Sequence, residues 1–258
     1  MSLCHYDVYE CENSSAPVLM ILHGLLGSSE NWRTLAKRFS EYYSVYCVDC
    51  RNHGKSFHDD EMNYQVMAQD VFELMDHLNL EKVMIMGHSM GGKVVLSCLT
   101  IDESRFSKAV VVDIAARQYE YHHLSLLEQM NALDLSSFTT RSDVDKVFME
   151  AVSNKGIRSF LLKNLKRDSE GHFYWQCNVS ALLDSYPKIM GAISFEKKSS
   201  CRVCFIKGEF SDYINKEDER FFSKNFDSMS CVEIYGAGHW VQAEQPDMFY
   251  KVVREFCD

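Results

Sequence analysis

The stretch Lys82–Leu99, KVMIMGHSMGGKVVLSCL, decides how the rest of the chain is interpreted. Lys82–Met86 is a short, mostly apolar run typical of a buried parallel strand, and from Gly92 onward the apolar residues have helical spacing. Between them, Gly87-His88-Ser89-Met90-Gly91 predicts a tight strand-to-helix turn. Gly-x-Ser-x-Gly in that setting is typical of a nucleophilic serine, because the strained serine backbone leaves room only for small neighbours. We therefore expect Ser89 to be a nucleophile.

The same stretch comes close to a phosphate-binding loop. Gly87-x4-Gly92-Lys93 lacks only the Ser or Thr that should follow the lysine, and Val94 stands there. Valine cannot ligate magnesium, and a phosphate loop would leave Ser89 without a role. We therefore keep the interpretation with a serine nucleophile.

Composition and charge exclude several classes of function. The chain has 258 residues, 46% of them hydrophobic, so it can bury one large core and an inserted subdomain. Its 27 Lys and Arg against 37 Asp and Glu give a net charge of −10, which disfavours nucleic acid or anionic lipid as a partner. No apolar run is long enough to span a membrane, and Met1–Glu10 lacks the order of a secretion signal. We expect a soluble, cytoplasmic protein with a small-molecule substrate.

The ten cysteines are scattered and form no dense disulfide framework, so we expect buried reduced thiols. Two pairs, Cys47/Cys50 and Cys201/Cys204, have the C-x-x-C form of zinc half-sites. Positions three apart in a strand point to opposite faces and cannot bind one ion together. We therefore expect no metal site.

Short apolar runs alternate with helical patterns through most of the chain. The expected strands are rich in Val, Ile, Met and Cys: Val18–His23, Ser44–Asp49, Lys82–Met86, Lys108–Ile114, Arg202–Lys207 and Cys231–Tyr235. Leu3–Glu10 is expected as an antiparallel edge strand. Tyr64–Leu78 predicts a helix with Asn63 as its N-cap, and Gln245–Phe256 predicts a closing helix. This order predicts an α/β protein with a mostly parallel sheet flanked by helices.

Between Arg117 and Lys198 this alternation stops, and no convincing strand follows before Arg202. Helical spacing recurs there in four places: Leu124–Leu133, Val144–Val152, Ile157–Leu165 and Ser180–Ser185. We expect a helical cap of residues 117–198, inserted between two sheet strands of a core made of residues 1–116 and 199–258. Long insertions of this kind usually cover a site.

A serine hydroxyl is a weak nucleophile, so it needs a base within reach and a group that orients the base. Among ten histidines, His239 stands just after the last expected strand, in the glycine-flanked loop Gly236–Trp240. That position allows its imidazole to reach the carboxyl edge of the sheet. We expect His239 to be the base.

Two aspartates are candidates for the orienting acid. The usual position is a Gly-x-x-Asp turn after the strand Arg202–Lys207, but the count from Gly208 ends on Ser211, with Asp212 one place late. Asp113 lies at the carboxyl end of the strand that follows the serine turn and its helix, from which it could also reach His239. We favour Asp113 and keep Asp212 as the alternative, with Ser211 as possible support.

Acyl transfer also needs hydrogen-bond donors for the oxyanion. One is expected to be the backbone N–H of Met90, directly after the nucleophile. The other is expected to be the N–H of Leu25, because Gly24 lets the backbone of His23–Gly27 turn toward the serine.

Other side chains are candidates for substrate contact. His23, His88 and Trp240 are expected to touch substrate. Trp240 is also expected to wall an acyl pocket, together with Phe210, Tyr213 and the cap aromatics Tyr174 and Trp175. For Arg51, Asn52 and His53 we expect a turn made rigid by side-chain hydrogen bonds rather than a substrate contact.

Six segments carry a resemblance that covers nearly the whole chain: LHGLLGSSENW (Leu22–Trp32), VDCRNHGKS (Val48–Ser56), MNYQVMAQD (Met62–Asp70), GHSMGGK (Gly87–Lys93), VVDIA (Val111–Ala115) and GAGHWVQAEQPD (Gly236–Asp247). Together they resemble the α/β-hydrolase superfamily and, more narrowly, the small bacterial YbfF-type esterases, which implies the α/β-hydrolase fold. In that subfamily the acid is the aspartate after the strand that follows the serine turn and helix, with a serine near the usual acid position. This matches Asp113 and Ser211. Asp212 is a departure, because a carboxylate beside Ser211 could share the orienting role.

These expectations combine into a serine hydrolase that cleaves carboxylic esters or thioesters through an acyl-enzyme, with no metal or organic cofactor. A cofactor-free lyase or a carbon–carbon bond hydrolase would use the same three residues. A non-catalytic ligand-binding sensor would keep the fold, but a pure binder has no need of a strained serine.

Overall fold

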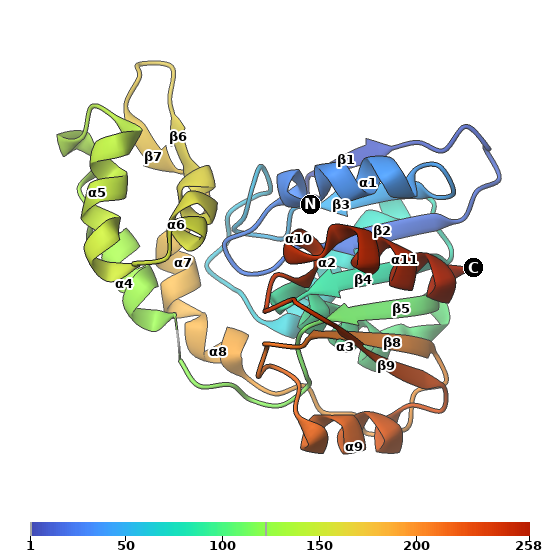
Figure 1. Cartoon of the computed structure of the whole chain (residues 1–258). Coiled ribbons are helices and arrows are strands. Elements are labelled where there is room, and N and C mark those ends of the chain that lie inside the picture. Colours follow the sequence, from blue (N-terminus) through green and yellow to red (C-terminus); the bar gives the residue numbers. More distant parts are fainter. Residues whose placement is uncertain (1, 122) are drawn as a thin grey trace.

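The computed structural model describes residues 2–121 and 123–258. Within these residues the main sheet has seven strands, in the order β1-β3-β2-β4-β5-β8-β9 (Figure 1). The strands are β1 (Tyr6–Tyr9), β2 (Val18–Leu22), β3 (Ser44–Val48), β4 (Val83–His88), β5 (Phe106–Val112), β8 (Arg202–Gly208) and β9 (Met229–Ile234). β1 pairs antiparallel with β3 at the edge, and the other neighbours pair parallel. The predicted fold class and its antiparallel edge strand are confirmed.

Helices cover both faces of this sheet (Figure 1). One face packs against α1 (Arg33–Phe39) and α11 (Pro246–Cys257), and the other against α2 (Tyr64–His77), α3 (Met90–Asp102) and α9 (Lys216–Asn225). Because side chains alternate along a strand, β4 contributes to both cores. Its Val83 and Ile85 pack on the α2–α3 face, whereas its Met84 and Met86 pack on the α1–α11 face.

The helix α2 forms where its sequence pattern predicts it. The Asn63 side chain accepts hydrogen bonds from the backbone N–H groups of Gln65 and Val66, which satisfies two donors of the first turn. The buried stripe includes Met67, Val71, Leu74 and Met75. This stripe fixes α2 against the sheet beside α3.

Between β5 and β8 the chain leaves the sheet and forms a mostly helical segment (Figure 1). Its elements are α4 (Leu124–Ala132), α5 (Arg141–Ala151), α6 (Lys155–Leu161), β6 (Leu165–Arg167), β7 (Phe173–Trp175), α7 (Val179–Asp184) and α8 (Tyr186–Met190). The small sheet of β6 and β7 differs from the expectation that no strand precedes Arg202. Strands of three residues are too short for an alternating pattern to be detected. The division into a core and a cap of residues 117–198 stays a prediction.

The two connections to this segment lie side by side. Ile193 N–H donates to the carbonyl of Ala116 at 2.7 Å, and Tyr119 N–H donates to the carbonyl of Met190 at 2.9 Å. None of the helices formed by residues 2–121 and 123–258 has the length and apolar character needed to cross a membrane.

The ten cysteines, all within the described residues, are free thiols, and eight of them are buried. Cys47 and Cys204 pack in the core on the α1–α11 face, whereas Cys50 and Cys201 pack on the α2–α3 face. The expectation that each C-x-x-C pair points to opposite sides is therefore confirmed. In the described part of the chain, no group of three or more His, Cys, Asp or Glu could hold a metal ion.

Candidate active site

The serine turn joins β4 to α3. Ser89 has φ 51° and ψ −117°, a left-handed conformation that is strained for a residue with a side chain. A Cβ on Gly87 would lie 2.1 Å from the carbonyl oxygen of Gly91, and a Cβ on Gly91 would lie 2.6 Å from that of His23. Only glycine fits at these two positions, which is the steric reason for the motif.

His239 lies in the loop between β9 and α10 (Val241–Glu244). Glu244 anchors this loop, because its carboxylate accepts from Gly238 N–H at 2.8 Å and from Trp240 N–H at 3.2 Å. The imidazole stacks on the Tyr213 ring with centroids 3.9 Å apart. Its Nδ1 lies 2.7 Å from Oδ2 of Asp113. The structure therefore brings His239 and the favoured aspartate together.

Asp113 follows β5 with φ 50° and is fully buried. Its Oδ1 accepts from the backbone N–H of Gly208 at 3.0 Å, and its Oδ2 accepts from the Ser211 hydroxyl as well as from His239. Asp212 is exposed, and its backbone carbonyl accepts from the Arg117 guanidinium at 3.4 Å. The geometry thus favours Asp113 as the orienting acid, with Ser211 as a hydrogen-bond donor to it.

The turn of His23–Gly27 lies directly against the serine. A Cβ on Gly24 would lie 3.3 Å from the Cβ of Ser89. The turn is closed by a hydrogen bond from Gly27 N–H to the Gly24 carbonyl at 2.9 Å. Met90 is the first residue of α3, and N–H groups in the first turn of a helix have no intrahelical acceptor. The two expected oxyanion donors thus lie on segments that adjoin Ser89.

His23 and His88 are buried histidines that contact backbone. The Nδ1–H of His23 donates to the Gly24 carbonyl at 2.8 Å, and its Nε2 accepts from Cys50 N–H at 3.0 Å. Both ring nitrogens are engaged, which leaves none for a hydrogen bond to substrate. The Nε2–H of His88 donates to the carbonyl of His239 at 2.8 Å and so supports the loop that carries the expected base. Burial lowers the pKa of His23 to about 4 and that of His88 to about 3, so both rings are neutral at pH 7.

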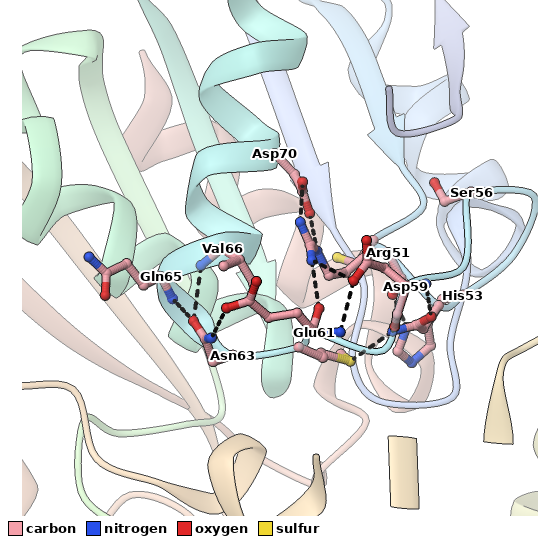
Figure 2. Close-up of polar contacts among 12 residues, drawn as sticks. Arg51, His53, Ser56, Asp59, Glu61, Asn63, Gln65, Val66 and Asp70 are labelled. Atoms are coloured by element: carbon pink, nitrogen blue, oxygen red, sulfur yellow. Dashed lines mark hydrogen bonds and ion pairs between the residues drawn. The ribbon is translucent and has the colours of Figure 1, made fainter. Parts of the chain in front are cut away.

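The loop after β3 is held rigid by its own side chains, as expected. Arg51, Asn52 and His53 are all buried. Figure 2 shows the Arg51 guanidinium between the Asp70 carboxylate of α2, at 2.6 and 2.7 Å, and the Glu61 carbonyl, at 2.6 Å. His53 Nδ1–H donates to the Arg51 carbonyl at 3.0 Å. The expectation of a rigid turn is confirmed.

A cavity of about 950 Å³ opens beside Ser89 and His239. The expected site residues that line it are Ser89, Met90, Leu25, His23, His88, His239 and Trp240. Tyr213 lines it as well. Phe210, which is 74% exposed, does not line it, and neither do Tyr174 and Trp175, so the prediction was wrong for these three residues. Phe210 and Tyr213 stand three positions apart in a loop, and a loop has no regular period that tells which side chain faces the site.

The segment of residues 117–198 forms part of the same cavity wall. Leu126, Ile157 and Phe160 line the cavity. The Phe160 ring lies against Trp240, with ring centroids 6.1 Å apart. One residue of this segment that sequence reasoning missed is Asn164, whose amide Nδ2 donates to the Leu26 carbonyl at 2.8 Å. A contact across 138 residues leaves no signal in local sequence patterns.

The sequence and the structure of this chain are similar to those of known proteins. The profile of the alpha/beta hydrolase fold family matches residues 17–153. The chain is 34% identical to esterase YbfF of Escherichia coli (strain K12), over 96% of this chain and 95% of that protein. It is 31% identical to the sn-1-specific diacylglycerol lipase ABHD11 of Mus musculus, over 95% of this chain and 82% of that protein. A solved structure titled marine microorganism esterase is 34% identical, with a TM-score of 0.95, covering 99% of this chain and 100% of that one.

Proposed function

Because the chain belongs to the alpha/beta hydrolase fold family, we propose that it hydrolyses carboxylic esters or thioesters through Ser89, His239 and Asp113. The assignment as a carboxylic ester hydrolase agrees with the names of its esterase relatives. The observation that carries the proposed mechanism is the 2.7 Å contact between His239 and Asp113, beside a cavity that Ser89 also lines.

The contact with Asp113 sets the tautomer of His239. A carboxylate can only accept, so the proton of the neutral imidazole lies on Nδ1 and the lone pair lies on Nε2. In the first step, Ser89 Oγ attacks the acyl carbonyl carbon while His239 Nε2 takes the hydroxyl proton. The carboxylate of Asp113 stabilises the imidazolium that forms. When the tetrahedral intermediate collapses, His239 gives that proton to the departing alcohol or thiol.

Water resolves the acyl-enzyme by the same route. His239 Nε2 takes a proton from water as its oxygen attacks the acyl carbon, and then returns the proton to Ser89 Oγ as the carboxylic acid leaves. In both steps the N–H groups of Leu25 and Met90 hold the negative oxygen. The chemistry uses only side chains and backbone of this chain and needs no metal or organic cofactor.

Residues 117–198 act in this proposal as a cap over the site. The contacts of Phe160 with Trp240 and of Asn164 with Leu26 support it, because each joins this segment to a loop of the sheet edge. The cap would set which acyl and leaving groups fit the cavity. The cytoplasmic location stays a prediction from the sequence.

Hydrolysis of p-nitrophenyl butyrate and of a butyryl thioester by purified variants tests the proposal. We expect Ser89→Ala and His239→Ala to lower kcat by several orders of magnitude, to the residual rate that the oxyanion donors and substrate binding alone supply. Ser97→Ala, which changes a serine elsewhere on α3, should keep the wild-type rate. A ligand-binding sensor would instead show a higher melting temperature with the ester and no product from any variant, and that result would overturn the proposal.

A further inference from the structure

The orientation of the Leu25 N–H depends on its own peptide group. The carbonyl of Gly24, in the same peptide plane, accepts from His23 Nδ1–H at 2.8 Å and from Gly27 N–H at 2.9 Å. In a trans peptide the N–H points opposite to the C=O. The two bonds on the carbonyl side therefore fix the direction in which Leu25 N–H points.

The next residue, Leu26, is held at both of its polar backbone groups. It has φ 60°, a left-handed conformation that costs a leucine on the order of 1 kcal/mol or more. Its N–H donates to Nε2 of His53 at 3.1 Å, and its carbonyl accepts from Nδ2 of Asn164 at 2.8 Å. Two side chains from distant segments thus hold a strained residue that adjoins the expected oxyanion donor.

Each of these two residues is itself anchored. His53 donates through Nδ1 to the Arg51 carbonyl, and Arg51 is fixed by Asp70 of α2 (Figure 2). Asn164 is 5% exposed, and its backbone carbonyl accepts from Gln176 N–H, just after β7, at 2.8 Å. The strained turn is therefore attached to the sheet core on one side and to the cap segment on the other.

We propose that Asn164 of the cap segment and His53 of the loop after β3 are positioning residues that hold the Leu25–Leu26 turn so that Leu25 N–H faces the oxyanion. This inference rests on the proposed function of Ser89. It has a consequence for the cap: a displacement of Asn164 moves the Leu26 carbonyl and misaligns an oxyanion donor. The cap thus contributes to the rate of acyl transfer as well as to the shape of the cavity.

Two substitutions at Asn164 and one matched control test the cap contact. Asn164→Leu and Asn164→Asp both remove the amide donor to Leu26. Asn178→Asp removes another amide donor of the cap segment, the one to Asn52 Oδ1 at 3.2 Å, and keeps the oxygen that caps α7. We expect a fall in kcat of about tenfold to a hundredfold at Asn164, since loss of a whole oxyanion donor costs about 10²–10³-fold. KM should stay within about twofold, and Asn178→Asp should change kcat by no more than about twofold.

A pair of substitutions at His53 tests the other contact. The amide oxygen of His53→Gln can accept from Leu26 N–H, whereas the ring of His53→Phe cannot. We expect His53→Gln to keep a larger share of the wild-type kcat than His53→Phe at equal KM. A higher kcat in His53→Gln would report on the hydrogen bond itself, because a general loss of packing would lower kcat in both variants.

Two outcomes would overturn the inference. The first is a wild-type kcat in an Asn164 variant whose melting temperature shows that it is folded, together with equal kcat in the two His53 variants. The second is an equal fall of kcat in the Asn164 and Asn178 variants. Failure of the proposed function looks different, because the wild type would then give no product, or Ser89→Ala would hydrolyse esters as fast as the wild type.

Discussion

Replacing Asp113 by asparagine changes one atom at the most constrained carboxylate of the site. The carboxylate accepts three hydrogen bonds, from Gly208 N–H at Oδ1 and from Ser211 and His239 at Oδ2. In Asp113→Asn the amide has one accepting oxygen, and Gly208 N–H holds that oxygen at the Oδ1 position. The NH₂ group then faces His239 Nδ1, which must accept, so the imidazole proton moves to Nε2 and the ring can no longer take the proton of Ser89.

The size of this effect follows from the loss of the correct tautomer. A change of this kind in a Ser-His-Asp triad lowers kcat by about 10⁴, which corresponds to about 5 kcal/mol of transition-state stabilisation. The assay is the kcat for p-nitrophenyl butyrate, with melting temperatures to show that each variant is folded. Asp212→Asn is the control and should stay within about twofold of the wild type, because that side chain is exposed. A large loss in Asp212→Asn with little loss in Asp113→Asn would refute the reasoning.

Three further predictions concern stability. Gly91→Ala places a Cβ 2.6 Å from the carbonyl oxygens of Leu22 and His23, so we expect it to lower the free energy of unfolding by about 1–3 kcal/mol or more, measured by urea titration. Burial lowers the pKa of His23 to about 4 and that of His53 to about 3, whereas an unfolded histidine titrates near 6.5. Between pH 6.5 and about pH 4, only the unfolded chain takes up these protons. The free energy of unfolding should therefore fall by up to about 1.4 kcal/mol for each histidine and each pH unit. A melting temperature equal at pH 7 and pH 5 would contradict this. Lys93→Met removes hydrogen bonds to the backbone carbonyls of Arg117 and Gly191, at the two ends of the cap segment. We expect it to lower the free energy of unfolding by about 1–3 kcal/mol and to speed proteolysis of the cap segment. A digestion rate equal to that of the wild type would contradict this.

Elements with a clear period and a clear boundary signal could be predicted from the sequence. The helix α2 combines an apolar stripe with an Asn63 cap, and β4 combines a fully buried run with glycines that only a tight turn requires. The pair β6 and β7 could not be predicted, because three residues carry no measurable alternation. Local patterns therefore predict the sheet and its layers but not the detail of the inserted segment.

The site residues also fall into those that local sequence patterns predict and those that they do not. Ser89 and His239 stand at recognisable places in the chain, whereas the choice between Asp113 and Asp212 depends on where each carboxylate points, which only the structure gives. His53 is recognisable as part of a polar turn, but its bond to Leu26 depends on the packing of two loops. Asn164 has no local signal at all, since its partner lies 138 residues away.

The central claim is that Ser89 is an activated nucleophile, and intact mass after treatment with a small fluorophosphonate tests it most directly. The reagent forms a stable adduct only with a serine that the site can deprotonate and whose oxyanion it can hold. Our account predicts one adduct on the wild type and none on Ser89→Ala under the same conditions. An unmodified wild type, or an equal adduct on Ser89→Ala, would contradict it.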